Sequence, residues 1–327
     1  MLRQKSLLVI LVKLIDELPW PPEPAKRSRG RPQAYSDRLI VKALVIMIIR
    51  RLYTAYALLT FLDQDDPLPQ QLRSLLYEQG HFPSRRTWER RLALLPPSLP
   101  RLLGGCGRHL VALLQPWAPH GRAGAVDSTP LATGGGVGHT KHRQQGGVPH
   151  TAIDTEAGWS KSGWHGWWYG WQLQLAGSVG AVWSPLAAEL TPANTADNEV
   201  APQLSAPLPA EVRSVLGDTA YNTPEVRQRC EQSNRALVAT RRGASPHRDD
   251  GVEVRRIFHQ LRSQAIEPFN GLFKNVFEWR TQMPVRGLRR SQLLALGASI
   301  VYQLVVLYQH EHHLPLGTGI KPLLRAA

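Results

Sequence analysis

The first third of the chain carries apolar residues in helical rather than alternating patterns. An apolar run at residues 7–12 predicts a short N-terminal helix. Ser36 and Asp37 can cap a second helix that runs through residues 39–62 and is apolar on most of its faces. Such a helix is largely buried, so we expect a helical domain to begin at residue 37.

A further helix is predicted after Ser84, a residue type that favours the N-cap position. The helical period places its large apolar residues on one side and most of its charged residues on others. This pattern resembles one half of a helix-turn-helix, so its first arginines are candidate DNA contacts. The apolar side consists of Trp88, Leu92 and Leu95, and the candidate contacts are Arg85 and Arg86.

Residues 19–36, between the first two helices, are rich in proline and in basic residues, which predicts an extended arm rather than packed structure. Within this arm, Arg29, Gly30, Arg31 and Pro32 follow one another in the order seen in hooks that lie in the minor groove of A·T-rich DNA. We interpret Arg29 and Arg31 as candidate DNA contacts. The alternative is a generic flexible basic linker.

The pattern changes at about residue 121 to glycine, tryptophan and strand-forming residues, and from there on it predicts alternating strands and helices. We therefore place a domain boundary between residues 116 and 122. Trp171 and Trp183 fall within predicted strands, where packing in the sheet is favoured over stacking on bases. The predicted strands are residues 123–127, 167–177, 179–190, 212–218 and 235–240, and the predicted helices are residues 191–204, 223–233 and 253–280, the last with a break at Pro268.

Three acidic residues lie where these elements would bring chemistry together. Asp127 and Asp218 each end a predicted strand, and Glu267 lies on the last predicted helix. The predicted elements follow the order of the ribonuclease-H-like fold: three meander strands, then helix, strand, helix, strand and helix. In that fold the first and fourth strands are neighbours. We expect an α/β domain of this type with a mixed five-stranded sheet, flanking helices and an all-helical region before it.

Charge and composition indicate which class of partner the protein binds. The 327 residues include 39 Lys and Arg against 25 Asp and Glu, a net charge of +14, which favours a polyanion such as nucleic acid. A ribosomal or membrane-surface protein, or simply a basic proteome, would show the same excess. The apolar run at residues 293–308 is shorter than a membrane span and predicts a buried helix. Lys13 and Asp16 interrupt the N-terminal apolar run, so we expect a cytoplasmic, nucleoid-associated protein without membrane contact.

Four sequence blocks make a more specific resemblance. They resemble the successive blocks of bacterial insertion-sequence transposases of the DDE type. The blocks are AVDSTPL, YGWQLQL with ELTPANTADN, VLGDTAYNTPEVR and AIEPFNGLFK. They cover about residues 122–290. The short stretch between Asp218 and Glu267 has no room for the large β-insertion of some relatives, so the resemblance is to the compact type.

The resemblance implies metal-dependent cleavage and strand transfer at the ends of an insertion sequence, with double-stranded element ends and target DNA as partners. It implies Asp127, Asp218 and Glu267 as catalytic ligands of two Mg²⁺ or Mn²⁺ ions, and a homodimer on DNA. Carboxylates suit this role because hard cations prefer oxygen ligands. Four domains are expected: residues 1–36, the N-terminal helix and arm; 37–118, the DNA-binding region; 119–313, the catalytic domain; and 314–327, a tail.

The block around Glu267 departs from the family pattern in one respect. The Glu to Lys spacing of the family is kept by Glu267 and Lys274, which we interpret as a DNA contact, but Gln260 and Ser263 stand at the usual Tyr and Arg positions. Arg262 is one residue off and is a candidate substitute. The alternatives are a decayed or domesticated transposase that binds DNA without cutting it, and a metal nuclease without strand transfer.

Overall fold

The computed structural model forms two compact units, which are described separately. One comprises Met1–His109 with Gln292–Ala327, and the other Leu110–Ser291. The four-part domain division at residues 36, 118 and 313 stays a prediction. The structure describes residues 6–20, 34–115, 122–133, 154–162, 166–239, 266, 269–271, 273–279 and 282–327.

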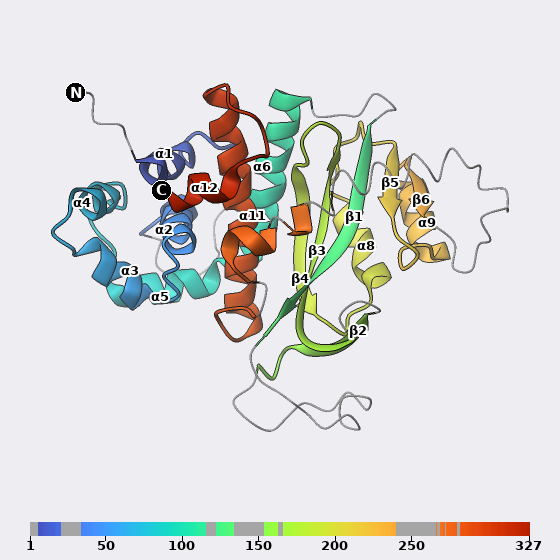
Figure 1. The fold of residues 1–327 in the computed structure, drawn as a ribbon, viewed down its shortest axis with the longest axis horizontal. Coiled ribbons are helices and arrows are strands. Elements are labelled where there is room, and N and C mark those ends of the chain that lie inside the picture. The colour runs from blue at the N-terminus through green and yellow to red at the C-terminus, as the bar shows by residue number, and fades with distance from the viewer. Residues whose placement is uncertain are drawn as a thin grey trace. The chain divides into compact units, whose positions relative to one another are not determined.

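The first unit is helical (Figure 1). Its longest helix, α11, packs closely on α2, since a Cβ atom added at Gly297 would lie only 2.6 Å from Cδ1 of Ile48. The helices in chain order are α1 (Leu7–Leu14), α2 (Asp37–Ile49), α3 (Ala55–Leu62), α4 (Pro67–Ser74), α5 (Arg85–Leu94), α6 (Leu99–Leu114), α11 (Leu288–Glu311) and α12 (Ile320–Arg325), with a 3₁₀ turn at Pro96–Ser98; α6 and α11 each continue into the second unit.

The single helix predicted over residues 39–62 is wrong, because the chain turns between α2 and α3. Arg51 has a positive φ of 57°, and Thr54 begins a new helix by accepting a hydrogen bond from the Ala57 N–H at 3.0 Å. The predicted start of α2 is confirmed, since Ser36 Oγ accepts from the Leu39 N–H at 3.2 Å. The apolar pattern continues through the turn between the two helices, so it did not reveal the break. The cap residue Thr54 marks it.

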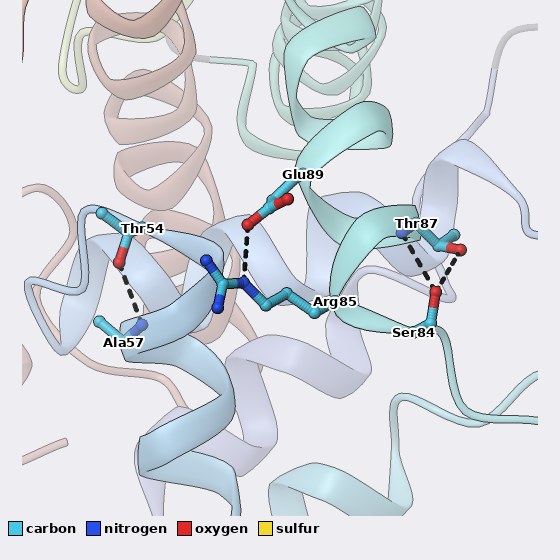
Figure 2. Close-up of polar contacts among 6 residues, drawn as sticks. All are labelled: Thr54, Ala57, Ser84, Arg85, Thr87 and Glu89. Atoms are coloured by element: carbon cyan, nitrogen blue, oxygen red, sulfur yellow. Dashed lines mark hydrogen bonds and ion pairs between the residues drawn. The ribbon is translucent and has the colours of Figure 1, made fainter.

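The predicted start of α5 and its apolar side are confirmed. Ser84 Oγ accepts from the Thr87 N–H at 3.3 Å, as Figure 2 shows. Trp88, Leu92 and Leu95 are all buried, as the helical period requires.

The buried helix predicted over residues 293–308 is confirmed as part of α11. By length and apolar composition this one helix of the described chain would be able to cross a membrane, but 89% of its most apolar stretch is buried inside the protein. Gln303, a polar residue within that stretch, donates from Nε2 to the Leu103 carbonyl at 2.9 Å. Burial with a satisfied amide donor is the behaviour of a core helix.

The second unit contains a mixed sheet centred on β1 (Figure 1). β3 pairs antiparallel with β1 and β4, whereas β5 and β6 continue parallel to β1, which gives the strand order β4-β3-β1-β5-β6. A short additional strand, β2, pairs with the start of β3 and was not predicted. The predicted ribonuclease-H-like fold class is confirmed. The strands are β1 (Ala123–Ala132), β2 (Gly158–Ser162), β3 (Gly166–Val179), β4 (Pro185–Pro192), β5 (Ser214–Gly217) and β6 (Ala236–Ala239).

The two faces of this sheet are covered by different elements. Helices α8 (Asp197–Ser205) and α9 (Pro224–Gln232), both predicted, share one apolar cluster with Val126 and Ala176 of the sheet. Side chains alternate along a strand, so Asp127, next to Val126, points to the opposite face. There it accepts a hydrogen bond from Asn270, which belongs to the described helical residues 266, 269–271 and 273–277. We call these residues the phenylalanine helix.

Candidate active site

Asp127 and Asp218 lie at the same level of two neighbouring parallel strands. The last registered pair of β1 and β5 is Ala125 with Leu216, and each aspartate follows two residues later on its own chain. The predicted pairing of the first strand with the fourth is therefore confirmed. The carboxyl ends of adjacent parallel strands are a common place for a ligand site, because loops diverge there.

Asp127 is buried on the β1 strand and is held from the phenylalanine helix. Asp127 is only 9% exposed. Its Oδ2 accepts a hydrogen bond from Nδ2 of Asn270 at 3.1 Å. The carbonyl oxygen of the same amide, Asn270 Oδ1, is buried and has no hydrogen-bond partner in the described chain. A buried polar atom without a partner is costly, so its presence beside a carboxylate is a feature of a functional site.

The phenylalanine helix has an apolar face and a polar face. Ile266, Phe269, Phe273 and Phe277 are buried, whereas Gly271 is exposed. Asn270 and Lys274 are half-buried and lie one turn apart. The apolar face thus anchors the helix while the polar face borders Asp127.

Lys274 lies close enough to Asp127 for their charges to interact. Burial lowers the pKa of the Lys274 ammonium from its usual value, and the attraction of the Asp127 carboxylate opposes this shift. A half-buried ammonium beside a carboxylate is in a good place to meet a phosphate that approaches the same acid. The DNA contact expected of Lys274 stays a prediction.

Tight packing holds the phenylalanine helix against the sheet. The rings of Trp183 and Phe269 have their centroids 4.0 Å apart. On the other side Trp183 presses on Gly177 of β3, where an added Cβ would lie 2.3 Å from its Cε2 atom. Trp171 is also fully buried, so the predicted packing role of both tryptophans is confirmed.

A second polar network, which was not predicted, lies on the opposite face of the sheet. Asp197, the first residue of α8, accepts at Oδ1 from the Nε2 atoms of Gln172 at 2.8 Å and Gln174 at 2.7 Å. Gln172 Nε2 also donates to Ser128 Oγ at 2.6 Å, and Tyr221 donates from its hydroxyl to Gln174 Oε1 at 3.3 Å. The signal in the sequence was the alternation of the two glutamines in YGWQLQL, which places them on one face.

This network borders both aspartates. Ser128 follows Asp127 directly, and the backbone N–H of Tyr221 donates to the Asp218 carbonyl at 3.2 Å. Burial raises the pKa of the Asp197 carboxyl, the hydrogen bonds from Gln174 and Ser128 lower it, and the charge of Asp218 raises it. Asp197 and Asp218 are therefore near enough to repel each other.

The other predicted site residues are only partly described. Arg85 forms an ion pair with Glu89 at 2.8 Å (Figure 2), and its guanidinium lies over the ring of the exposed Tyr56. Arg86 is exposed on the same helix. The predicted contacts that lie outside the described residues are Glu267, Arg262, Arg29 and Arg31, together with Gln260 and Ser263.

In the described part of the chain, no group of three or more His, Cys, Asp or Glu side chains is close enough to hold a metal ion. The donors present at the strand ends are nevertheless hard oxygens, the carboxylates of Asp127 and Asp218 and the amide of Asn270. Oxygen donors of this kind suit Mg²⁺ or Mn²⁺ rather than a soft metal. The unpartnered Asn270 Oδ1 favours a cation or its hydration shell beside Asp127.

Comparison with known proteins identifies this arrangement. Residues 118–304, more than half of the chain, match the family model described as a transposase DDE domain. No curated protein matches the chain. Among solved structures, the crystal structure of a pre-cleavage Mos1 transpososome matches at 14% identity over 86% of this chain and 80% of that chain, with a TM-score of 0.20. With the family model spanning the sheet, both strand-end aspartates and the phenylalanine helix, the chain belongs to the family of transposases with a DDE domain.

Proposed function

We propose that Asp127, Asp218 and Glu267 are the catalytic carboxylates of this transposase and that together they hold two divalent cations, Mg²⁺ or Mn²⁺. The observation that carries the proposal is the level alignment of Asp127 and Asp218 on β1 and β5, with the phenylalanine helix in hydrogen-bond contact with Asp127. When bound, two such cations activate the attacking and the leaving oxygen of a phosphodiester. The reaction class is hydrolysis of DNA followed by transesterification.

The assignment of Glu267 rests on its neighbours in the sequence. Ile266 immediately before it is fully buried, and Asn270 three residues after it donates to Asp127. On a helix, residues three apart lie on the same side, so the spacing of Glu267 and Asn270 supports a carboxylate on the side that borders Asp127.

The remaining residues of the site bind and orient. Asn270 holds the Asp127 carboxylate through its Nδ2 donor, which keeps that side chain in one rotamer. Lys274 supplies a positive charge for the phosphate backbone of the substrate. Burial of the phenylalanine face excludes water from the back of the helix that carries both residues.

The substrates are the double-stranded ends of the element and its target DNA, on which we propose that the protein acts as a homodimer in the cytoplasm, at the nucleoid. The net charge of +14 supports a large DNA footprint. We propose that five arginines contact this DNA: Arg29, Arg31, Arg85, Arg86 and Arg262.

Excision from the native flanking DNA tests the proposal. With Mg²⁺ we expect the full-length protein to cut at both element ends and to yield joined product. Cleavage without joining would assign a nuclease, and binding without cleavage would assign a decayed or domesticated transposase. Because Gln260 and Ser263 replace the family's Tyr and Arg, the same assay on a Gln260→Tyr, Ser263→Arg variant measures what that departure costs.

Lys274→Ala is expected to weaken binding of element ends and to reduce the dependence of log affinity on log salt by about one unit. The reason is the loss of one phosphate contact next to Asp127. Fluorescence anisotropy over a salt series measures the slope. The control is Lys321→Ala, which removes the same charge from α12 in the other unit. A slope equal to that of the wild type would place Lys274 away from the phosphates.

The Arg29→Ala, Arg31→Ala double variant tests how the proline-rich arm binds. If the two arginines enter the minor groove, the variant loses more affinity on end DNA with A·T-rich flanks than with G·C-rich flanks, because narrow A·T tracts concentrate negative potential. Binding to both DNAs is measured at one fixed salt concentration. Equal losses on the two DNAs would make the arm an electrostatic tether without groove selectivity.

A further inference from the structure

Asp197 connects the two strand-end aspartates through buried and half-buried side chains. One of its oxygens, Oδ1, accepts from Gln172 Nε2 at 2.8 Å and from Gln174 Nε2 at 2.7 Å. The two glutamines are two residues apart on β3, so their side chains leave the same face of the sheet. A single carboxylate oxygen therefore sets the positions of two neighbouring amides.

Each glutamine forms a further hydrogen bond to a residue next to a different strand end. Gln172 donates to Ser128 Oγ at 2.6 Å, and Ser128 is bonded covalently to Asp127. Gln174 accepts from the Tyr221 hydroxyl at 3.3 Å, and the Tyr221 N–H donates to the Asp218 carbonyl at 3.2 Å. The network thus reaches the backbone next to Asp127 and the backbone of Asp218 itself.

Burial makes this network rigid. The side chains of Gln174 and Tyr221 are both 0% exposed, so the hydrogen bond between them is shielded from water and is costly to lose. Asp197 sits at the N-terminus of α8, where the helix dipole favours an ionised carboxylate as acceptor. Its partners are amide donors on the face of the sheet opposite to the Asp127 side chain, which suits a role in holding rather than in binding a cation.

We propose that Asp197 is a positioning residue that fixes Asp127 and Asp218 relative to each other through Gln172, Gln174, Ser128 and Tyr221. The proposal rests on the proposed role of these two aspartates as metal ligands. Residues that orient metal ligands commonly change metal affinity or activity by about 10- to 100-fold when they are removed. Removal of Asp197 should therefore weaken metal binding without removing a ligand.

The first measurement needs neither metal nor activity. Hydrogen exchange of the full-length protein is followed in the segment 218–223, which includes the Tyr221 amide. Asp197→Ala is expected to lose protection there, because Gln174 loses its acceptor and no longer holds the Tyr221 hydroxyl in a fixed position. Asp197→Asn retains a carbonyl acceptor and should keep most of the protection. Glu199→Ala removes an exposed acid from the same first turn of α8 and should leave exchange unchanged.

The second measurement is binding of Mn²⁺, followed by its electron paramagnetic resonance signal, together with the Mg²⁺ concentration for half-maximal cleavage. Asp197→Ala is expected to raise both midpoints about tenfold or more, with Asp197→Asn much closer to the wild type. Tyr221→Phe, which breaks the network at its far end, should shift the midpoints in the same direction even if Asp197→Ala folds poorly.

Two results would overturn the proposal. One is unchanged exchange at 218–223 and an unchanged Mn²⁺ midpoint in both Asp197→Ala and Tyr221→Phe. The other is an Asp197→Asn variant as defective as Asp197→Ala, because this would make the charge itself essential and Asp197 a ligand. Failure of the proposed function looks different: Asp127→Ala would bind Mn²⁺ like the wild type while Asp197→Ala still lost protection at 218–223.

Discussion

Replacement of Asp127, Asp218 or Glu267 by alanine is expected to lower cleavage of element-end DNA by at least about a thousandfold, because each change removes a proposed oxygen ligand of the cations. Affinity for the same DNA without metal should stay nearly unchanged, or rise slightly, since a negative charge is removed from a DNA-binding surface. Single-turnover cleavage with Mg²⁺ and metal-free binding are measured on the same protein preparations.

The matched control is Glu225→Ala, which removes an exposed acid from the first turn of α9 in the same unit. This variant should cut at the wild-type rate. An alanine variant at any one of the three carboxylates that still cut nearly as fast as the wild type would exclude that residue as a ligand. A loss of metal-free DNA binding in step with cleavage would instead indicate that the variant had misfolded.

Phe273→Ala is expected to lower the free energy of unfolding of the second unit by about 3–5 kcal/mol, the usual cost of a large cavity in a packed core. Phe273 is 1% exposed and its ring contacts those of Phe269, Phe277 and Trp279, with centroids 5.2–5.7 Å away. Urea denaturation followed by tryptophan fluorescence measures the change. Cleavage should fall as well, because the helix that it anchors carries Asn270 and Lys274.

Gly271→Ala is the control on the exposed side of the same helix. A Cβ at Gly271 meets no atom within 4 Å, and alanine in place of glycine inside a helix favours the helix by up to about 1 kcal/mol. We therefore expect equal or higher stability and unchanged cleavage. A Phe273→Ala variant as stable as Gly271→Ala would show that the phenylalanine face is not part of the core.

Local sequence patterns predicted most of the strands and helices of the second unit. Alternating and helical periods located five of the six described strands, together with α8, α9 and the cap residues Ser36 and Ser84, because these features depend on residues close in sequence. The same patterns failed at the turn between α2 and α3. Continuous apolar residues suit a buried helix whether or not it bends, so periodicity could not locate the break.

The acids of the site were predicted from the ends of strands and from resemblance, and strand pairing then decided their alignment. Asp127 and Asp218 lie far apart in the sequence, and only the parallel pairing of β1 with β5 brings them to one level. That pairing depends on the burial of the strands against helices on both faces, which no local window contains.

The sequence by itself determined the order of the elements from β3 to β6 and the three candidate carboxylates, since each follows from local periodicity or from a short block. Only the tertiary structure decided that Asn270 holds Asp127 and that Asp197 collects the amides of Gln172 and Gln174. The physical reason is that a hydrogen bond requires two atoms at about 3 Å with the correct direction. Long-range packing, rather than the type of either residue, sets that geometry.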